Sequence, residues 1–170
     1  MKDRLEAVQA DITTLAVDAI VNAANAQLVP GAGVDGAIRQ AGGAQLNAEL
    51  ARIGYCAPGS AVLTPGYSLP ARFVIHTVAP IWRGGDAEEE RLLASCYTTA
   101  LNLADQNGIV SIAFPAIGTG AYGWPARRAS ELAFDAVAKH FARGGRQHVI
   151  FCCFSAEDRE RYAELISALP

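Results

Sequence analysis

Lysine is nearly absent from this sequence. Only two lysines occur among its 170 residues, the net charge is −3, and the arginines are scattered singly apart from the pair Arg127-Arg128. Contact with a nucleic-acid backbone depends on clustered lysine and arginine side chains. Because the chain has no basic stripe, its charge gives no indication of a nucleic-acid partner.

Long hydrophobic runs are also missing. The chain is 51% hydrophobic, yet no apolar run reaches the roughly 20 residues that a membrane-spanning helix needs. The first eleven residues, MKDRLEAVQAD, do not have the pattern of a signal peptide. Length and composition fit one globular domain with a substantial core. We therefore expect a single domain over residues 1–170, a cytoplasmic location and no membrane partner.

The four cysteines lack the paired CxxC spacing of zinc and redox sites. Cys56 and Cys96 stand alone, whereas Cys152 and Cys153 are adjacent in an apolar run and should point to opposite faces of a strand. We expect buried, reduced thiols rather than disulfides or metal ligands. The three histidines show no metal-binding spacing either, so we expect no metal and no cofactor.

Apolar segments with strand character alternate with amphipathic helical segments along most of the chain. This alternation predicts an α/β layered fold. The early strands follow one another closely, so we expect a central mixed, largely parallel sheet. The predicted strands are 5–10, 17–24, 61–64, 73–79, 109–114 and 148–154, and the predicted helices are 34–41, 44–52, 88–106, 125–143 and 156–169.

Two glycine loops match the pattern GxGxxG, which in a suitable context marks a dinucleotide-binding site. That context is missing here, because the residues AQLVP separate the first loop from its strand and no βαβ unit follows the second loop. Loops that follow parallel strands meet at one edge of the sheet, so we expect these loops to clamp one diphosphate through backbone N–H groups. The alternative is that the glycines only make tight turns. The glycines are Gly31, Gly33 and Gly36 in the first loop, and Gly118, Gly120 and Gly123 in the second.

Asp35 lies in the first turn of the helix that follows the first loop. The start of a helix attracts anions, but a carboxylate there would repel a phosphate placed directly on it. Asp35 should therefore face another part of the ligand, such as a sugar hydroxyl, a water molecule or a bond to be broken.

The chain contains, in this order, the segments DITTLAVDAIVNAAN, GVDGAI, PARFVIHTVAP and FPAIGTGAYGWP. Together these segments resemble the macrodomain family, and most closely its MacroD-type branch, which includes bacterial O-acetyl-ADP-ribose deacetylases. The resemblance implies a three-layer α/β/α fold with a cleft that binds ADP-ribose. It also implies hydrolysis of esters at the distal ribose, both in O-acetyl-ADP-ribose and where mono-ADP-ribose is attached to acidic side chains of proteins.

The resemblance implies roles for individual residues along the cleft. Asp11 would accept a hydrogen bond from the adenine amino group, Ile12 would contribute its backbone N–H, and Phe154 would stack on the adenine. Asp11 could instead be a strand-end cap, and Phe154 could be a core residue. The diphosphate and distal ribose would be held by Gly33 and Val34 on one side and by Gly118, Thr119, Gly120, Ala121 and Tyr122 on the other.

Asn25 and Asp35 match the residues that the family uses for catalysis. Asn25 would orient the ribose hydroxyls, and Asp35 would act as general base on a water molecule. Asn22 is expected to support the loop by bonding to its backbone. His76, in the middle of a strand, is expected to be a hydrogen-bonded core residue rather than a base.

Four positions depart from the family pattern, and the first is Ala10, where glycine usually precedes the segment DIT. Pro30 and Ala32 interrupt a run that is usually glycine, and Ala32 would be strained if its backbone needed positive φ. Arg39 stands where histidine is common. The changes in the first loop leave the rate and the preferred leaving group open. Two alternative functions also stay open, namely an ADP-ribose reader that does not cleave its ligand and a regulatory binding protein.

Overall fold

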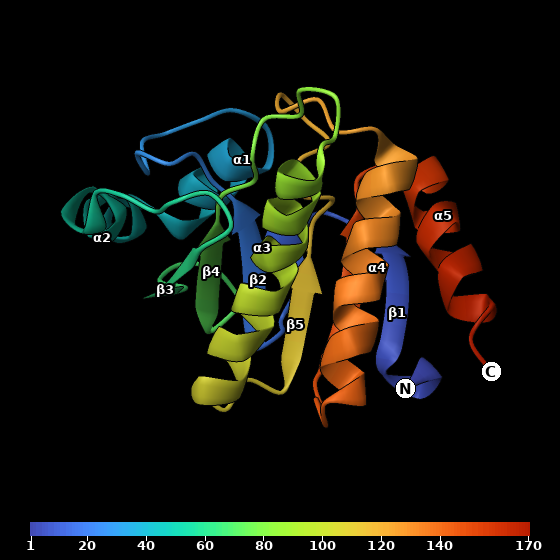
Figure 1. Cartoon of the computed structure of the whole chain (residues 1–170). Helices are drawn as coiled ribbons and strands as arrows, with labels where there is room; N and C mark the ends of the chain where they lie inside the picture. Colours follow the sequence, from blue (N-terminus) through green and yellow to red (C-terminus); the bar gives the residue numbers. More distant parts are fainter.

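The computed structural model describes residues 1–170 and contains one six-stranded sheet (Figure 1). The strand order is β1-β6-β5-β2-β4-β3, and all neighbours are parallel except β3 and β4. The expected mixed, largely parallel sheet is therefore confirmed. The strands are β1 (Leu5–Gln9), β2 (Ala19–Ala23), β3 (Ala61–Pro65), β4 (Phe73–Thr77), β5 (Ser111–Phe114) and β6 (His148–Cys153).

Helices cover both faces of the sheet and make three layers. One core lies under α1 and α2, where Ile38 and Leu50 pack with Ile20 of β2. The other core lies under α3, α4 and α5, where the Tyr162 ring stacks on Phe151 at 4.3 Å between centroids. The helices are α1 (Gly33–Gly42), α2 (Ala44–Ile53), α3 (Ala87–Gln106), α4 (Ala126–Ala142) and α5 (Ala156–Ser167), with short 3-10 helices η1 (Lys2–Arg4) and η2 (Ile12–Thr14).

The adjacent cysteines show how β6 serves both cores. Cys152 belongs to the core under α1 and α2, whereas Cys153 belongs to the core on the opposite face. All four cysteines are buried, as predicted.

Two strands start later than the apolar pattern predicts, and one side chain accounts for both. The Asp18 carboxylate accepts hydrogen bonds from Val110 N at 2.8 Å and from Ser111 N at 3.3 Å. These bonds occupy backbone donors at the entrance to β5, and they lower the pKa of Asp18. The ladder of β2 and β5 therefore begins at Ala19 rather than at Val17.

Helix starts follow the expected capping chemistry with one correction. Asp86 and Glu89 form a capping box at the start of α3, and Ser155 caps α5 through Asp158 N. Pro125 was predicted at the first helical position of α4, but it occupies the N-cap with extended ψ, and the helix begins at Ala126.

The parallel strands bring three loops to one end of the sheet, at the top of Figure 1. They are the segments that follow β2, β4 and β5. Since β2 pairs with both β4 and β5, the two glycine loops leave neighbouring strands. The candidate site lies between them.

Candidate active site

A cavity of about 410 Å³ lies between the two glycine loops. It confirms the expectation that both loops meet at one edge of the sheet. The residues that line it come from the end of β2, the first loop and the start of α1, the segment after β4, and the second loop. They are Ala23, Ala24, Asn25, Gly31, Ala32, Gly33, Val34, Asp35, Ala79, Ala116, Gly118, Gly120, Ala121 and Tyr122.

Within the two glycine loops, residues 31–36 and 118–123, eight of these lining residues have a backbone N–H with no acceptor in the protein. Four precede or open α1, and four belong to the second loop, which crosses from β5 to α4 without regular structure. Clustered free N–H groups at loops and helix starts bind anions, so the cavity is suited to a phosphate-containing ligand. The eight are Ala32, Gly33, Val34, Asp35, Gly118, Gly120, Ala121 and Tyr122.

The backbone of the first loop removes the strain expected at Ala32. Ala32 has φ −97° and takes an ordinary extended conformation as the N-cap of α1. The positive φ of +61° falls on Gly33, the next residue. The alanine is therefore compatible with this loop, because glycine remains at the position where the left-handed backbone is needed.

Asp35 is buried at the inner end of the cavity, with 3% of the residue exposed. Its Oδ2 accepts from Gly31 N at 2.7 Å, and its Oδ1 accepts from Asn22 Nδ2 at 2.8 Å. Arg39 Nε lies 3.0 Å from Oδ2 and 3.2 Å from Oδ1. The carboxylate is thus fixed by a loop, a strand and its own helix.

Arg39 is the partner that sequence reasoning did not assign to Asp35. It is 4% exposed, and besides Asp35 it donates to Leu28 O at 2.8 Å and to Asn47 Oδ1 at 3.1 Å. The i,i+4 spacing of Asp35 and Arg39 on α1 was a visible signal for an ion pair. Nothing in the sequence pattern, however, showed that the pair would be buried.

Asn25, and not Asn22 as expected, bonds to the backbone of the first loop. Asn22 bonds to the Asp35 side chain and to His76, not to the loop backbone. Asn25 holds the loop instead, since its Oδ1 accepts from Val29 N at 3.1 Å and its Nδ2 donates to Val29 O at 2.8 Å. Asn22 projects from β2 toward the α1 side of the sheet, where no loop backbone is in reach of its amide.

A small space separates Asn25 from Asp35 at Gly31. A Cβ on Gly31 would lie 3.1 Å from Asp35 Oδ2 and 3.5 Å from Asn25 Nδ2. Because Gly31 has no side chain, the space between Asn25 and Asp35, the two predicted catalytic residues, stays open.

Behind Asp35, a buried histidine continues the polar cluster. Asn22 Nδ2 lies 3.0 Å from His76 Nδ1, and His76 Nε2 lies 3.0 Å from Thr64 Oγ1. Burial, with a smaller contribution from the positive charge of Arg39, lowers the pKa of His76 to about 3. His76 is therefore a neutral, hydrogen-bonded core residue, as predicted.

The lowered pKa of His76 makes the free energy of unfolding depend on pH. The folded pKa of His76 is below the unfolded value of about 6.5, so unfolding takes up a proton between pH 6.5 and 3 and stability falls as pH falls. At about 1.4 kcal/mol per pH unit, His76 should lower the free energy of unfolding by about 2 kcal/mol between pH 7 and pH 5. Urea denaturation at both pH values should show this loss in the wild type and not in His76→Gln. Equal losses in both proteins would contradict the assignment.

Four predicted ligand residues lie outside the lining of the cavity. Thr119 turns back on its own loop, since its N–H and Oγ1 both donate to Ala116 O. Asp11, Ile12 and Phe154 follow the ends of β1 and β6, on the far side of β5 from β2.

Two of these residues resolve alternatives that the sequence left open. Asp11 Oδ1 accepts from Thr13 N at 3.0 Å and caps η2, but no protein donor reaches its Oδ2. Phe154 is 95% exposed, so the interpretation of Phe154 as a core residue is wrong. Both side chains keep a free face at the end of the sheet where the cavity opens.

Comparison with known proteins decides the family. The Macro domain model matches residues 21–133, which include the end of β2, both glycine loops and the whole cavity lining. The chain belongs to the macrodomain family. The family and the three-layer α/β/α fold that the sequence predicted are both confirmed.

Relatives and solved structures match this macrodomain over nearly its whole length. A macro domain-containing protein of Ralstonia nicotianae is 51% identical over 93% of this chain and 91% of the relative. An O-acetyl-ADP-ribose deacetylase of Citrobacter rodentium is 46% identical over 98% of this chain and 97% of the relative. The Oceanobacillus iheyensis macrodomain, solved with ADP, has a TM-score of 0.92 at 38% identity and covers 97% of this chain and 93% of its own.

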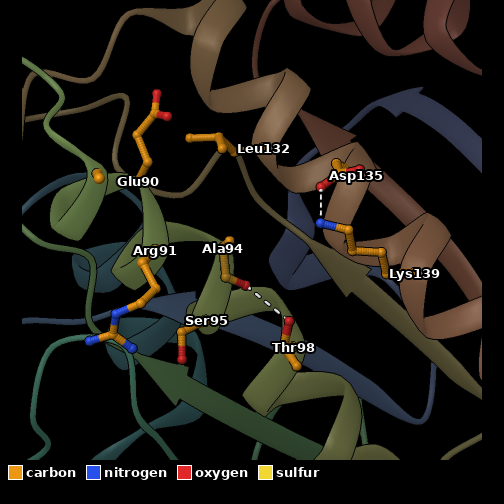
Figure 2. A pocket seen from close by; sticks show the side chains of 9 residues that line it. Glu90, Arg91, Ala94, Ser95, Thr98, Leu132, Asp135 and Lys139 are labelled. Carbon is orange, nitrogen blue, oxygen red and sulfur yellow. Dashed lines mark hydrogen bonds and ion pairs between the residues drawn. The ribbon is translucent and has the colours of Figure 1, made fainter.

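A second hollow, of about 430 Å³, lies between α3 and α4 (Figure 2). Its charged residues are already paired, for example Asp135 with Lys139 at 2.8 Å and Arg91 with Glu88 at 2.6 Å. It has no free charge to recognise a ligand.

None of the helices is both long and apolar enough to cross a membrane.

Proposed function

We propose that this macrodomain binds ADP-ribose in the cavity between its glycine loops and hydrolyses esters at the distal ribose. O-acetyl-ADP-ribose is the first substrate to test, and mono-ADP-ribose linked to acidic side chains of proteins is the second. The observation that carries the proposal is the coincidence of eight unpaired N–H groups with a buried carboxylate in one cavity. The names of several relatives support it.

The proposed placement runs the ligand along the end of the sheet. The adenine lies between Asp11 and Phe154, where an open carboxylate oxygen and an exposed ring are available. Ile12 N–H contacts the adenine as well. The diphosphate takes the N–H groups of the two loops, and Tyr122 packs against the distal ribose.

Asp35 and Asn25 perform the proposed chemistry. Asp35 accepts a proton from a water molecule as the oxygen of that water attacks the acyl carbonyl carbon. The ester C–O bond then breaks, the ribose oxygen takes the proton held by Asp35 and becomes a hydroxyl, and acetate and ADP-ribose leave while the second proton of the water passes to solvent. Asn25 already braces Val29, but its amide retains a second N–H and a second lone pair with which to orient a ribose hydroxyl.

Acetate release from O-acetyl-ADP-ribose tests this function, with Gly31→Ala as the informative variant. The wild type should release acetate and bind ADP-ribose in calorimetry. The alanine methyl would fill the space between Asp35 and Asn25, so turnover should fall about tenfold or more. The φ of Gly31 lies outside the left-handed region, so the variant should fold.

The outcomes separate the alternatives. A wild type that binds ADP-ribose without releasing acetate is a reader, which needs the loops but not Asp35. A wild type that does not bind ADP-ribose contradicts the whole proposal. Unchanged turnover in Gly31→Ala would show that the reaction does not take place between Asn25 and Asp35.

A further inference from the structure

The buried side chains behind Asp35 form a continuous chain of hydrogen bonds. It runs from Asp35 Oδ1 to Asn22, then to His76 and to Thr64, which donates to Pro65 O at 3.1 Å. Asn22, His76 and Thr64 are each no more than 1% exposed. None of the three residues lines the cavity, so any effect on substrate must pass through Asp35.

Only one assignment of donors and acceptors is consistent along this series of hydrogen bonds. Asn22 Nδ2 gives one N–H to Asp35 Oδ1 and the other to His76 Nδ1, which must then be unprotonated. His76 therefore carries its proton on Nε2 and donates it to Thr64 Oγ1. The Thr64 hydroxyl hydrogen is left for Pro65 O.

The register of β2, β4 and β3 in the sheet places the three hydrogen-bonded side chains next to one another. Asn22 of β2 and His76 of β4 are direct partners in the parallel pair, and Thr64 of β3 lies diagonally across from His76 because Val62 is the direct partner of His76. The series of hydrogen bonds thus crosses three neighbouring strands and ends at the edge strand of the sheet.

The orphaned oxygen of Asn22 shows what determines the amide orientation. Asn22 Oδ1 is buried and has no hydrogen-bond partner, whereas both hydrogens of the same amide are used. Buried polar atoms normally find partners. The Asn22 nitrogen lies between two acceptors, Asp35 Oδ1 and His76 Nδ1, so these two contacts determine the orientation of the amide and its own oxygen is left unpaired.

We propose that His76 and Thr64 are positioning residues, which fix the donor of Asn22 toward Asp35 and so hold the carboxylate in the orientation that accepts a proton. This inference rests on the proposed hydrolase function. Thr64 sets the tautomer of His76, because its oxygen accepts the Nε2 proton. The tautomer leaves Nδ1 free to accept from Asn22, and the second Asn22 N–H then points at Asp35.

Thr64→Val and Thr64→Ser form the matched pair that tests the proposal. Valine keeps the branched shape that suits a strand and removes the hydroxyl, while serine keeps the hydroxyl. In Thr64→Val we expect kcat for acetate release to fall about three- to tenfold, the range that one neutral hydrogen bond is worth. KM and ADP-ribose affinity should stay within about twofold of wild type, and Thr64→Ser should restore kcat.

Nitrogen NMR of the histidine rings supplies a readout that needs no turnover. The wild type and Thr64→Ser should show the Nε2–H tautomer for His76, and Thr64→Val should populate the Nδ1–H tautomer. An Nδ1–H tautomer in the wild type would overturn the proposal, and so would wild-type kcat in Thr64→Val. Equal loss of kcat in the valine and serine variants would also overturn it, since that would mean a packing effect.

Different results would overturn the hydrolase function and the positioning role of His76 and Thr64. If the wild type releases no acetate but His76 has the Nε2–H tautomer, the proposed function fails and the hydrogen-bonded chain stands as a structural feature without a catalytic role. That result also overturns the positioning role. If the wild type is active and Thr64→Val is equally active, only the positioning role fails.

Discussion

Replacing Asp35 with asparagine should lower acetate release by about two to four orders of magnitude, the usual contribution of a general base. Asparagine has nearly the shape of aspartate and can still accept from Gly31 N or from Asn22 through its remaining oxygen. It cannot accept a proton from water. ADP-ribose affinity should change far less, because the ligand-facing N–H groups belong to the backbone of the two loops.

The measurement is single-turnover acetate release beside calorimetric binding of ADP-ribose. Asp135→Asn is the matched control, because it makes the same chemical change at an exposed position on α4, away from the cavity. The control should keep wild-type turnover. If Asp35→Asn binds ADP-ribose and turns over at the wild-type rate, Asp35 is not the base, and its pairing with Arg39 is purely structural.

The sequence was most informative where local chemistry determines the backbone. Apolar strands, amphipathic segments and glycine breaks located every strand and α-helix to within a few residues, whereas the 3-10 helices η1 and η2 were not predicted. The two glycine loops also predicted the cavity, because the ends of parallel strands must meet at one edge of the sheet. Gly33 illustrates the limit, since only the structure shows that it, rather than Ala32, takes the left-handed conformation.

The surroundings of Asp35 depend on distant pairings and could not be predicted. Asn22 reaches His76 because of the register of β2 with β4, which lie about fifty residues apart in the chain. Thr64 joins them through a third strand. In the sequence, Arg39 has the ordinary i,i+4 spacing of a helical ion pair with Asp35. Only its packing against α2 and Leu28 makes this ion pair a buried one. Such contacts arise from the assembled sheet, not from a pattern of residue types.

Replacing Arg39 with methionine should lower the free energy of unfolding by about 3–5 kcal/mol, as expected when one partner of a buried ion pair is removed. Methionine fills much of the same volume but leaves Asp35 buried without its cation. Leu28 O and Asn47 Oδ1 lose donors as well. Urea denaturation at pH 7 measures the loss, and bound ADP-ribose should recover part of it if the cavity binds that ligand.

The double variant Arg39→Met with Asp35→Asn decides the cause of this loss. If the cost arises from the unpaired carboxylate, removing its charge should return about half or more of the stability lost in Arg39→Met, so that the two substitutions are far from additive. If the cost arises from the lost bonds to Leu28 and Asn47, the double variant should be at least as unstable as Arg39→Met alone. The second result would make Arg39 a brace between α1, the first loop and α2. The first would make it the counter-ion that allows this macrodomain to bury a carboxylate beside the first glycine loop.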